Sequence, residues 1–448
     1  MRARIRRPWR RWARPTFALG VVVSTALGLL LVGGALGGRG TAPVGGPQST
    51  VAVPAGPNDR LAATISRDQQ RLRAVPGDWT TWAGLGSAYL EWARITADPT
   101  YYPKAQGAAD RSLALRPDAN PDALVVLGAL ANARHDFTGA RQYALAALAG
   151  NGYDADAYGV LADAQTQLGD AAAATDAVQR MLDLRPGLPA YARASYDLEQ
   201  HGRLDEATDL MRRAAQAAAD PRDAAFCRAQ LGELAFATGD LAEADRQYSA
   251  ARAADPSSLS ALRGTARVAT AAGHLDAALD GYADLTRRTP TPGYLIEYAE
   301  LLRVAGRAAD ADAQLRLAGA AQQLFTANGG TDGLTSAALA VALGQPAVAV
   351  SAAQGEWDRR QHADVADALA WALHLAGRDT EALPYAQRAT VTGARSAGYA
   401  YHLGAIELAL GQREAAHAEL ARALATNPYF SPVDAPVARR LLAEAGAA

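Results

Sequence analysis

The sequence predicts an all-α fold in which about ten helix-turn-helix repeats stack into a solenoid behind an N-terminal transmembrane helix. Two observations predict the solenoid: a glycine recurs with a period of roughly 34 residues, and an alanine follows each glycine after five positions. An uncharged apolar run near the N-terminus predicts the membrane span. The glycine–alanine pairs are Gly169/Ala174, Gly202/Ala207, Gly239/Ala244, Gly273/Ala278, Gly306/Ala311, Gly344/Ala349, Gly377/Ala382 and Gly411/Ala416.

The N-terminal segment predicts a membrane anchor. Residues 1–15 form a basic tail with seven arginines, and residues 16–38 carry no charge. About 20 apolar residues suffice to cross the hydrocarbon core, and positive charge stays on the cytoplasmic side. We therefore expect a single-pass signal anchor in the cell membrane, with the tail in the cytoplasm and the rest of the chain outside. The alternative is a signal peptide cleaved at the small residues between Gly33 and Gly37, which would make the protein secreted.

The segments that follow predict a linker and two capping helices around the repeats. Residues 39–57 are rich in glycine, proline and alanine, which indicates a flexible linker. Residues 58–77 predict an N-terminal capping helix and residues 433–448 a C-terminal one. Terminal repeats need such caps because an apolar face is otherwise exposed. The solenoid itself is expected to span residues 78–432.

Within each repeat, two antiparallel helices must pack closely. A small residue lies seven positions before each glycine, and the alanine lies five positions after it. Both helices therefore carry small side chains where they cross. The glycine ends the first helix, because a positive φ is tolerated there at little cost. Prolines are expected to end several second helices, each 17 residues after a turn glycine. These prolines are Pro186, Pro256, Pro290 and Pro428.

One stretch carries a recognisable motif. Trp82, Leu85, Gly86 and Tyr89 match the pattern W-x2-L-G-x2-Y in full. On this motif and the period, the chain resembles tetratricopeptide-repeat (TPR) proteins, in particular bacterial membrane-anchored ones, over residues 78–432. The resemblance implies a right-handed superhelix whose first helices line a concave groove that binds a peptide or a protein. Only one of the 44 lysine and arginine residues is a lysine, which indicates a GC-rich, actinobacterial genome.

The resemblance also implies which side chains face the groove, through fixed positions on each first helix. Aromatic residues and arginines dominate binding energy at protein interfaces, and Arg263 and Arg267 lie one turn apart, so together they could hold an acidic group. The alternative is that arginines and glutamates of adjacent repeats pair, as Arg267 with Glu233 or Glu300. The candidate groove residues are Arg193, Tyr196, Glu199, Glu233, Phe236, Arg263, Arg267, Glu300, Arg303, Trp371, His374 and Tyr401.

Several classes of function are disfavoured. The net charge of −2 argues against a nucleic-acid partner, and the single cysteine, Cys227, excludes an intrachain disulfide. No catalytic motif occurs, so we expect no enzyme activity, no cofactor and no metal. The lysine-rich clamp of chaperone-binding TPR proteins is absent, because Lys104 is the only lysine.

The predicted function is a membrane-tethered scaffold whose groove binds a peptide segment or partner protein. One alternative is self-association within an envelope assembly. Another is a metal-handling or hydrolytic protein built around His374 and His402, which lie on first helices of neighbouring repeats.

Overall fold

The computed structural model describes residues 57–446, and every regular element in that range is helical. It contains 22 α-helices and a single turn of 3-10 helix, Pro99–Tyr101. The α-helices are α1 (Pro57–Ala74), α2 (Trp79–Thr96), α3 (Tyr102–Leu115), α4 (Pro121–Ala133), α5 (Phe137–Gly150), α6 (Ala155–Leu168), α7 (Ala171–Leu184), α8 (Leu188–Gln200), α9 (Leu204–Gln216), α10 (Pro221–Ala237), α11 (Leu241–Ala254), α12 (Leu259–Ala271), α13 (Leu275–Arg288), α14 (Pro292–Val304), α15 (Ala308–Ala327), α16 (Gly333–Ala342), α17 (Pro346–Arg359), α18 (Ala363–Leu375), α19 (Asp379–Ala389), α20 (Ala397–Ala409), α21 (Arg413–Thr426) and α22 (Asp434–Gly446).

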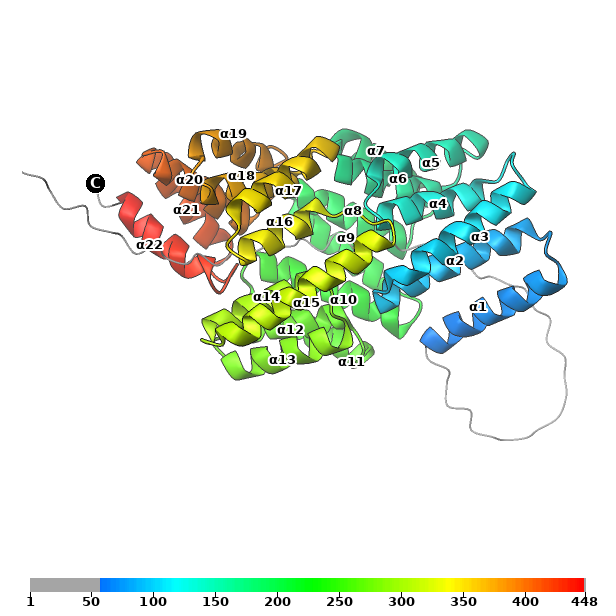
Figure 1. Ribbon diagram of the computed structural model, residues 1–448, viewed down its shortest axis with the longest axis horizontal. Coiled ribbons are helices and arrows are strands. Elements are labelled where there is room, and N and C mark those ends of the chain that lie inside the picture. Colours follow the sequence, from blue (N-terminus) through cyan, green and yellow to red (C-terminus); the bar gives the residue numbers. More distant parts are fainter. Residues whose placement is uncertain (1–56, 447–448) are drawn as a thin grey trace, which may run out of the picture.

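The helices pack as ten hairpins, from α2 with α3 to α20 with α21, stacked in chain order (Figure 1). At the first hairpin, Ile65 and Leu72 of α1 pack beside Trp82 and Leu85. At the last hairpin, α22 contributes Val437 to the cluster around Leu420 and Tyr401. The expectation of an all-α array of about ten paired helices is confirmed within the described residues.

The glycine–alanine pattern does what the sequence predicts. All eight turn glycines have a positive φ, between 70° and 84°. All eight alanines that follow them are at most 1% exposed. The second helices α7, α11, α13 and α21 each end two residues before the predicted proline. Small residues therefore bring the two helices of each hairpin together, and glycine makes the turn between them.

Departures from the 34-residue period have local causes. The helix α15 has 20 residues and accounts for the 38-residue step from Gly306 to Gly344. In the second hairpin, His135 takes the place of the turn glycine and adopts a φ of 61°. A left-handed conformation costs a non-glycine residue about 1–2 kcal/mol. Contacts from a distant part of the chain surround this residue.

Those contacts belong to a seam where the array meets itself. Arg134 donates a hydrogen bond of 3.2 Å from Nε to the carbonyl of Asn328, and its own carbonyl accepts one of 3.0 Å from the Thr331 amide. Further along, Gly202 lies against the backbone of Gly393. We call this the closing seam: turns at 134–135, 168–169, 201–202 and 236–239 contact the connections at 328–332, 359–362, 393–395 and 427–428.

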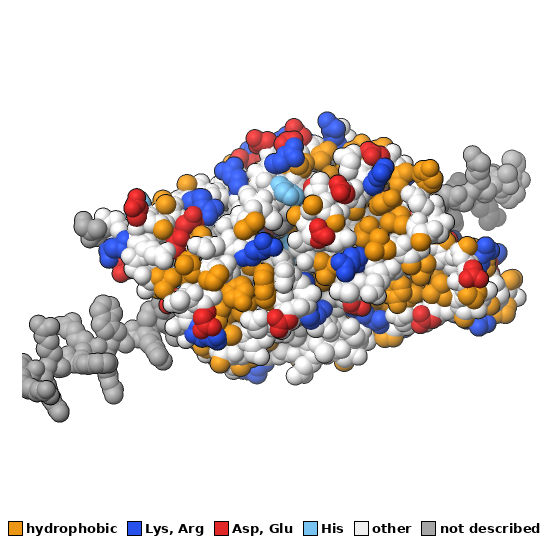
Figure 2. Space-filling view, turned by 90° about the horizontal axis from the view of Figure 1, so that it is seen from above, with side chains coloured by type: hydrophobic (Ala, Val, Ile, Leu, Met, Phe, Trp, Pro, Cys, Tyr) orange, Lys and Arg blue, Asp and Glu red, His pale blue; other side chains and the backbone are white. Residues whose placement is uncertain are grey.

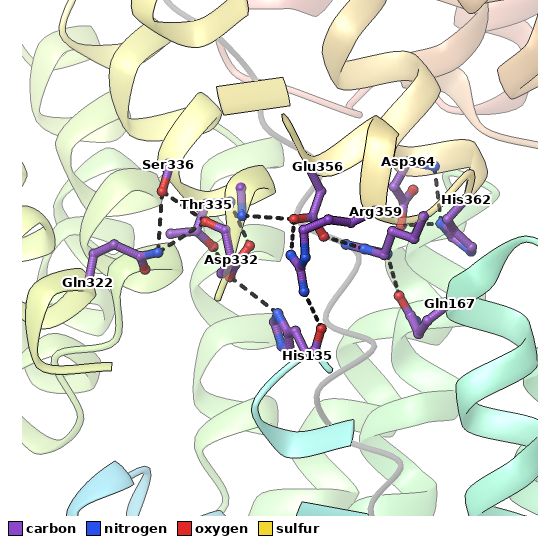
Figure 3. Close-up of polar contacts among 12 residues, drawn as sticks. His135, Gln167, Gln322, Asp332, Thr335, Ser336, Glu356, Arg359, His362 and Asp364 are labelled. Atoms are coloured by element: carbon purple, nitrogen blue, oxygen red, sulfur yellow. Dashed lines mark hydrogen bonds and ion pairs between the residues drawn. The ribbon is translucent and has the colours of Figure 1, made fainter. Parts of the chain in front are cut away.

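Figure 3 shows the polar part of the closing seam. Glu356 is 1% exposed and pairs with both Arg359 and Arg360. From there, Arg359 donates to the carbonyl of His135 at 2.5 Å, and Arg360 donates to Oε1 of Gln167 at 2.6 Å. Glu356 thus holds two arginines that bind His135 and Gln167 in the first half of the chain. Along this line, the first half of the array contacts its C-terminal half.

The described residues contain no helix that is both long and apolar enough to cross a bilayer. The predicted basic tail at 1–15 and signal anchor at 16–38 lie outside the described residues. So does the predicted linker at 39–57, except for Pro57, which begins α1.

Candidate partner-binding cavity

A cavity of about 440 Å³ lies on the concave side of the middle hairpins. One wall is formed by the first helices α8, α10, α12 and α14, and the opposite wall by residues between 394 and 439. The volume falls in the range of small-molecule pockets, ~300–1,000 Å³, so it admits a few side chains and not a folded domain. The C-terminal part of the chain adds a second wall to the predicted groove, and the resulting cavity stays partly open.

Seven of the twelve predicted groove residues line this cavity. They come from four successive first helices, as the repeat register implies. These residues are Tyr196, Glu199, Glu233, Phe236, Arg263, Arg267 and Glu300.

An ion-pair network fills the floor of the cavity. Arg263 is 6% exposed and binds Glu297 through Nε and Nη2 at 2.7–3.0 Å, with Glu233 3.4 Å from its Nη1. Arg267 donates to Glu233 at 2.6 Å and lies over the ring of Phe236, 4.0 Å from its centroid. Both glutamates thus have arginine partners in the wall.

Two tyrosines complete the network. Tyr248 donates from its hydroxyl to Glu233 at 2.8 Å, and Tyr282 donates to Glu297 at 3.1 Å. The Tyr248 ring occupies the place where a Cβ on Gly232 or Gly264 would lie. Two glycines on neighbouring first helices are therefore needed to admit this ring.

The network satisfies its own charges. Burial opposes ionisation, but Glu297 and Glu233 outweigh it and hold the pKa of Arg263 well above its usual value. Burial likewise opposes ionisation of Glu233, and Arg267 and Arg263 outweigh it and lower the pKa of that carboxyl. The pairing of Arg267 with Glu233, the alternative considered from the sequence, is what the structure shows. Of the two glutamates considered for Arg267, the structure pairs it with Glu233, while Arg263 pairs with Glu297.

Two cavity residues stand apart from this network. The side-chain carboxyl of Glu199 forms no hydrogen bond or ion pair with the described residues, and the buried hydroxyl of Tyr196 has no hydrogen-bond partner there. Burial, together with the neighbouring carboxylates Glu233 and Asp364, raises the pKa of Glu199 to about 7. Glu199 is half-buried, whereas the Tyr196 hydroxyl is a buried polar group, and such a group is costly to leave unpaired.

The other five predicted residues lie away from the cavity. Arg193 is paired with Asp163 at 2.8 Å, and Arg303 donates to the carbonyl of Ala342 at 2.6 Å. Trp371, His374 and Tyr401 belong to an aromatic cluster that also contains His402 and Phe430.

The aromatic cluster is buried because the chain after α21 returns over it. Phe430 lies 5.5 Å from the ring of Tyr401, which is 1% exposed. The Trp371 ring stacks against His374 at 4.9 Å and against His402 at 4.1 Å. Repeat position alone places these rings on the concave side, but the returning segment fills that side here.

The histidines of this cluster bind carboxylates. His374 contacts Asp379 at 2.5 Å through Nδ1, and His402 contacts Asp367 at 2.9 Å. Across residues 57–446, no three histidine, cysteine or acidic side chains come together in a way that would hold a metal ion. Both histidines also stack on the ring of Trp371.

Sequence reasoning missed the opposite wall of the cavity. Arg395, Tyr399 and Arg439 line it, together with the loop from Asn427 to Pro432. None of these residues is among the groove residues that the repeat register predicts. Only the closing seam brings them there, and it joins residues about 190 positions apart.

Comparisons with known proteins give a likeness at the level of architecture. No protein-family model matches the chain, and no curated protein matches it. Among solved structures, the chain is similar to the APC/C hetero-tetramer Cut9–Hcn1, with 17% identity and a TM-score of 0.44 over 87% of this chain and 77% of that one. It is also similar to a human IFIT1 dimer with PPP-AAAA, with 14% identity and a TM-score of 0.47 over 74% and 78%. A tetratricopeptide repeat protein from Parabacteroides merdae matches with 18% identity and a TM-score of 0.35 over 58% and 98%.

Proposed function

We propose that this chain is a non-catalytic scaffold that binds an extended peptide segment of a partner protein in the cavity between its middle hairpins and its C-terminal part. The observation that supports this most is the cavity itself, which is lined by seven residues that the repeat register places on the concave face. The ion-pair network gives it a rigid floor. A rigid, preorganised site reduces the entropy that binding would otherwise cost.

The outer surface fits a protein-binding role better than nucleic-acid binding. On the face in Figure 2, acidic and basic side chains are interspersed, and apolar side chains gather between them. A nucleic-acid site would need many basic side chains gathered in one patch. We keep a protein or peptide as the proposed partner, with self-association as an alternative.

The proposed location is outside the cytoplasmic membrane, tethered by residues 16–38. Support comes from the sequence alone: an arginine-rich tail followed by an uncharged apolar run. Sequencing the N-terminus of the mature protein tests this, because a start after Ala35 or Gly37 would contradict a retained anchor.

The binding role is tested by closing the cavity. Gln230 lines it on α10, so Gln230→Trp should fill it and reduce recovery of the partner from membranes at least ~10-fold, the equivalent of about 1.4 kcal/mol. Gln387 lies exposed on α19, and Gln387→Trp is the matched control that should change recovery little. Equal recovery with both variants would contradict binding in the cavity.

A photo-crosslinking residue identifies what the cavity contacts. Placed at position 230, it should crosslink a partner protein on illumination of intact cells. Placed at position 387, it should not. A crosslink only to a second copy of this chain would instead support self-association.

A further inference from the structure

The cavity carries a charge pattern that points to its ligand. Four acidic and four basic side chains line it: Glu199, Glu233, Glu297 and Glu300, with Arg263, Arg267, Arg395 and Arg439. Glu233 and Glu297 are neutralised by Arg263 and Arg267. Arg439 donates to the carbonyl of Pro428, and Arg395 is exposed on the connection before α20. The side-chain carboxyl of Glu199 forms no hydrogen bond or ion pair with the described residues.

We propose that the cavity receives a lysine or arginine side chain of the bound segment, with Glu199 as its counter-charge and the Tyr196 hydroxyl as a second acceptor. This inference rests on the proposed function, since it names the chemistry that the peptide site selects. Tyr196 and Glu199 lie one turn apart on α8 and both line the cavity. Their oxygens are thus on the same face of one helix.

The surroundings favour a cation over an anion. Glu233 and Asp364 are the charged groups that most affect Glu199, and both are carboxylates. Because Glu233 is paired with Arg263 and Arg267, and Asp364 is paired with His362, Glu199 is the carboxyl that would attract an ammonium or guanidinium group and repel an anion. Burial without a cationic partner also explains why the pKa of Glu199 is raised to about 7.

Aromatic rings provide the rest of the site. Phe226 and Tyr399 line the cavity together with Tyr196. The aliphatic stem of a lysine or arginine packs well on such surfaces, and the charged group gains cation–π attraction from the rings. A free metal ion fits less well, because no cluster of three metal-binding side chains occurs among the described residues.

Positional peptide libraries test the proposal. Each biotinylated library has one fixed central residue and mixed residues elsewhere, and capture by the purified full chain is measured. Libraries fixed as arginine or lysine should be captured at least ~10-fold better than those fixed as citrulline or glutamate. Equal capture of the arginine and citrulline libraries would overturn the inference and leave peptide binding intact. Capture of no library would overturn the proposed function as well.

Variants locate the selectivity. Glu199→Gln should reduce the preference for arginine to less than ~2-fold, and Tyr196→Phe should reduce it by a smaller factor. Glu206→Gln, in an exposed ion pair with Arg203, is the matched control and should keep the preference. A preference that persists in both Glu199→Gln and Tyr196→Phe would place the cation elsewhere.

Discussion

Asn427 donates a hydrogen bond of 2.8 Å from its side-chain amide to the backbone carbonyl of Phe236, which lies 191 residues earlier in the chain. Phe236 lines the cavity, and the loop that begins at Asn427 forms part of the opposite wall. The side-chain oxygen of Asn427 also accepts a bond of 2.8 Å from the Tyr429 amide. One buried asparagine thus joins the two walls of the site.

Replacing this asparagine should loosen the cavity wall. Asn427→Ala removes both bonds, and we expect a loss of about 1–2 kcal/mol in the free energy of unfolding. Hydrogen exchange of the backbone amides between 429 and 436 should become faster, because local opening of the loop costs less. Asn328→Ala is the control, since that side chain makes only an exposed bond to the carbonyl of Leu324. Unchanged exchange in Asn427→Ala would contradict the role assigned to this contact.

Two turn glycines of like conformation should respond differently to alanine. Gly202 and Gly377 have φ values of 71° and 74°, so alanine at either position should cost about 1–2 kcal/mol from backbone strain. At Gly202 the carbonyl of Gly393 occupies the place of a Cβ, whereas nothing lies within 4 Å at Gly377. Gly202→Ala should therefore cost a further ~1–3 kcal/mol by overpacking the closing seam.

Urea denaturation of the two glycine variants measures this difference. Equal losses of stability would mean that the closing seam contributes nothing at Gly202. A larger loss in Gly377→Ala would contradict the packing described for the turns.

Much of the hairpin could be predicted from the sequence, and the closure could not. The turn glycines and the alanines after them act within a hairpin or between neighbours, so their spacing alone shows their role. The contact of Gly202 with Gly393 depends on the rotation accumulated over several hairpins. A small change in the rotation between successive hairpins would move Gly202 and Gly393 apart. No local sequence pattern shows the accumulated rotation.

The path of distant parts of the chain also decides which predicted groove residues line the cavity. Glu199 and Glu233 lie on first helices of adjacent middle hairpins, and their register was sufficient to place them at the cavity. Trp371 and Tyr401 have equivalent registers, but the segment that carries Phe430 folds back over them. Register predicts the face of a helix, and the path of distant chain decides what covers that face.

The ion pair of Arg263 with Glu297 should be structural. Arg263→Met leaves Glu297 buried without its cation, and we expect a loss of about 3–5 kcal/mol in the free energy of unfolding. Adding Glu297→Leu should restore part of that loss, because both charges are then removed. Denaturant unfolding of the single and double variants measures the coupling.

The exposed pair of Arg203 with Glu206 is the control for that cycle. Both side chains are more than half exposed, at 56% and 57%, so Arg203→Met should cost far less stability than Arg263→Met. Similar costs for Arg203→Met and Arg263→Met would contradict a buried network. The expected instability also means that lost partner binding in Arg263→Met would not identify a contact with the partner.

Glu407 on α20 should make stability depend on pH. Burial and the nearby Glu419, against the opposing effect of Arg422, raise its pKa to about 7. An ordinary glutamate titrates at 4.5, so between that value and pH 7 the folded state binds more protons than the unfolded state. Stability from this group is complete below pH 4.5 and is lost as the pH rises through 7.

Glu407→Gln removes that dependence. Relative to the wild-type chain, the variant should be more stable by about 1–3 kcal/mol at about pH 8 and nearly unchanged at about pH 4. Glu444→Gln, at an exposed position of α22, should differ by less than about 0.5 kcal/mol at either pH. Urea denaturation at both pH values measures the difference. A Glu407→Gln variant that is less stable than wild type at the higher pH would show that the ionised carboxylate has a stabilising partner, and the assignment of Glu407 as a strained, buried acid would be wrong.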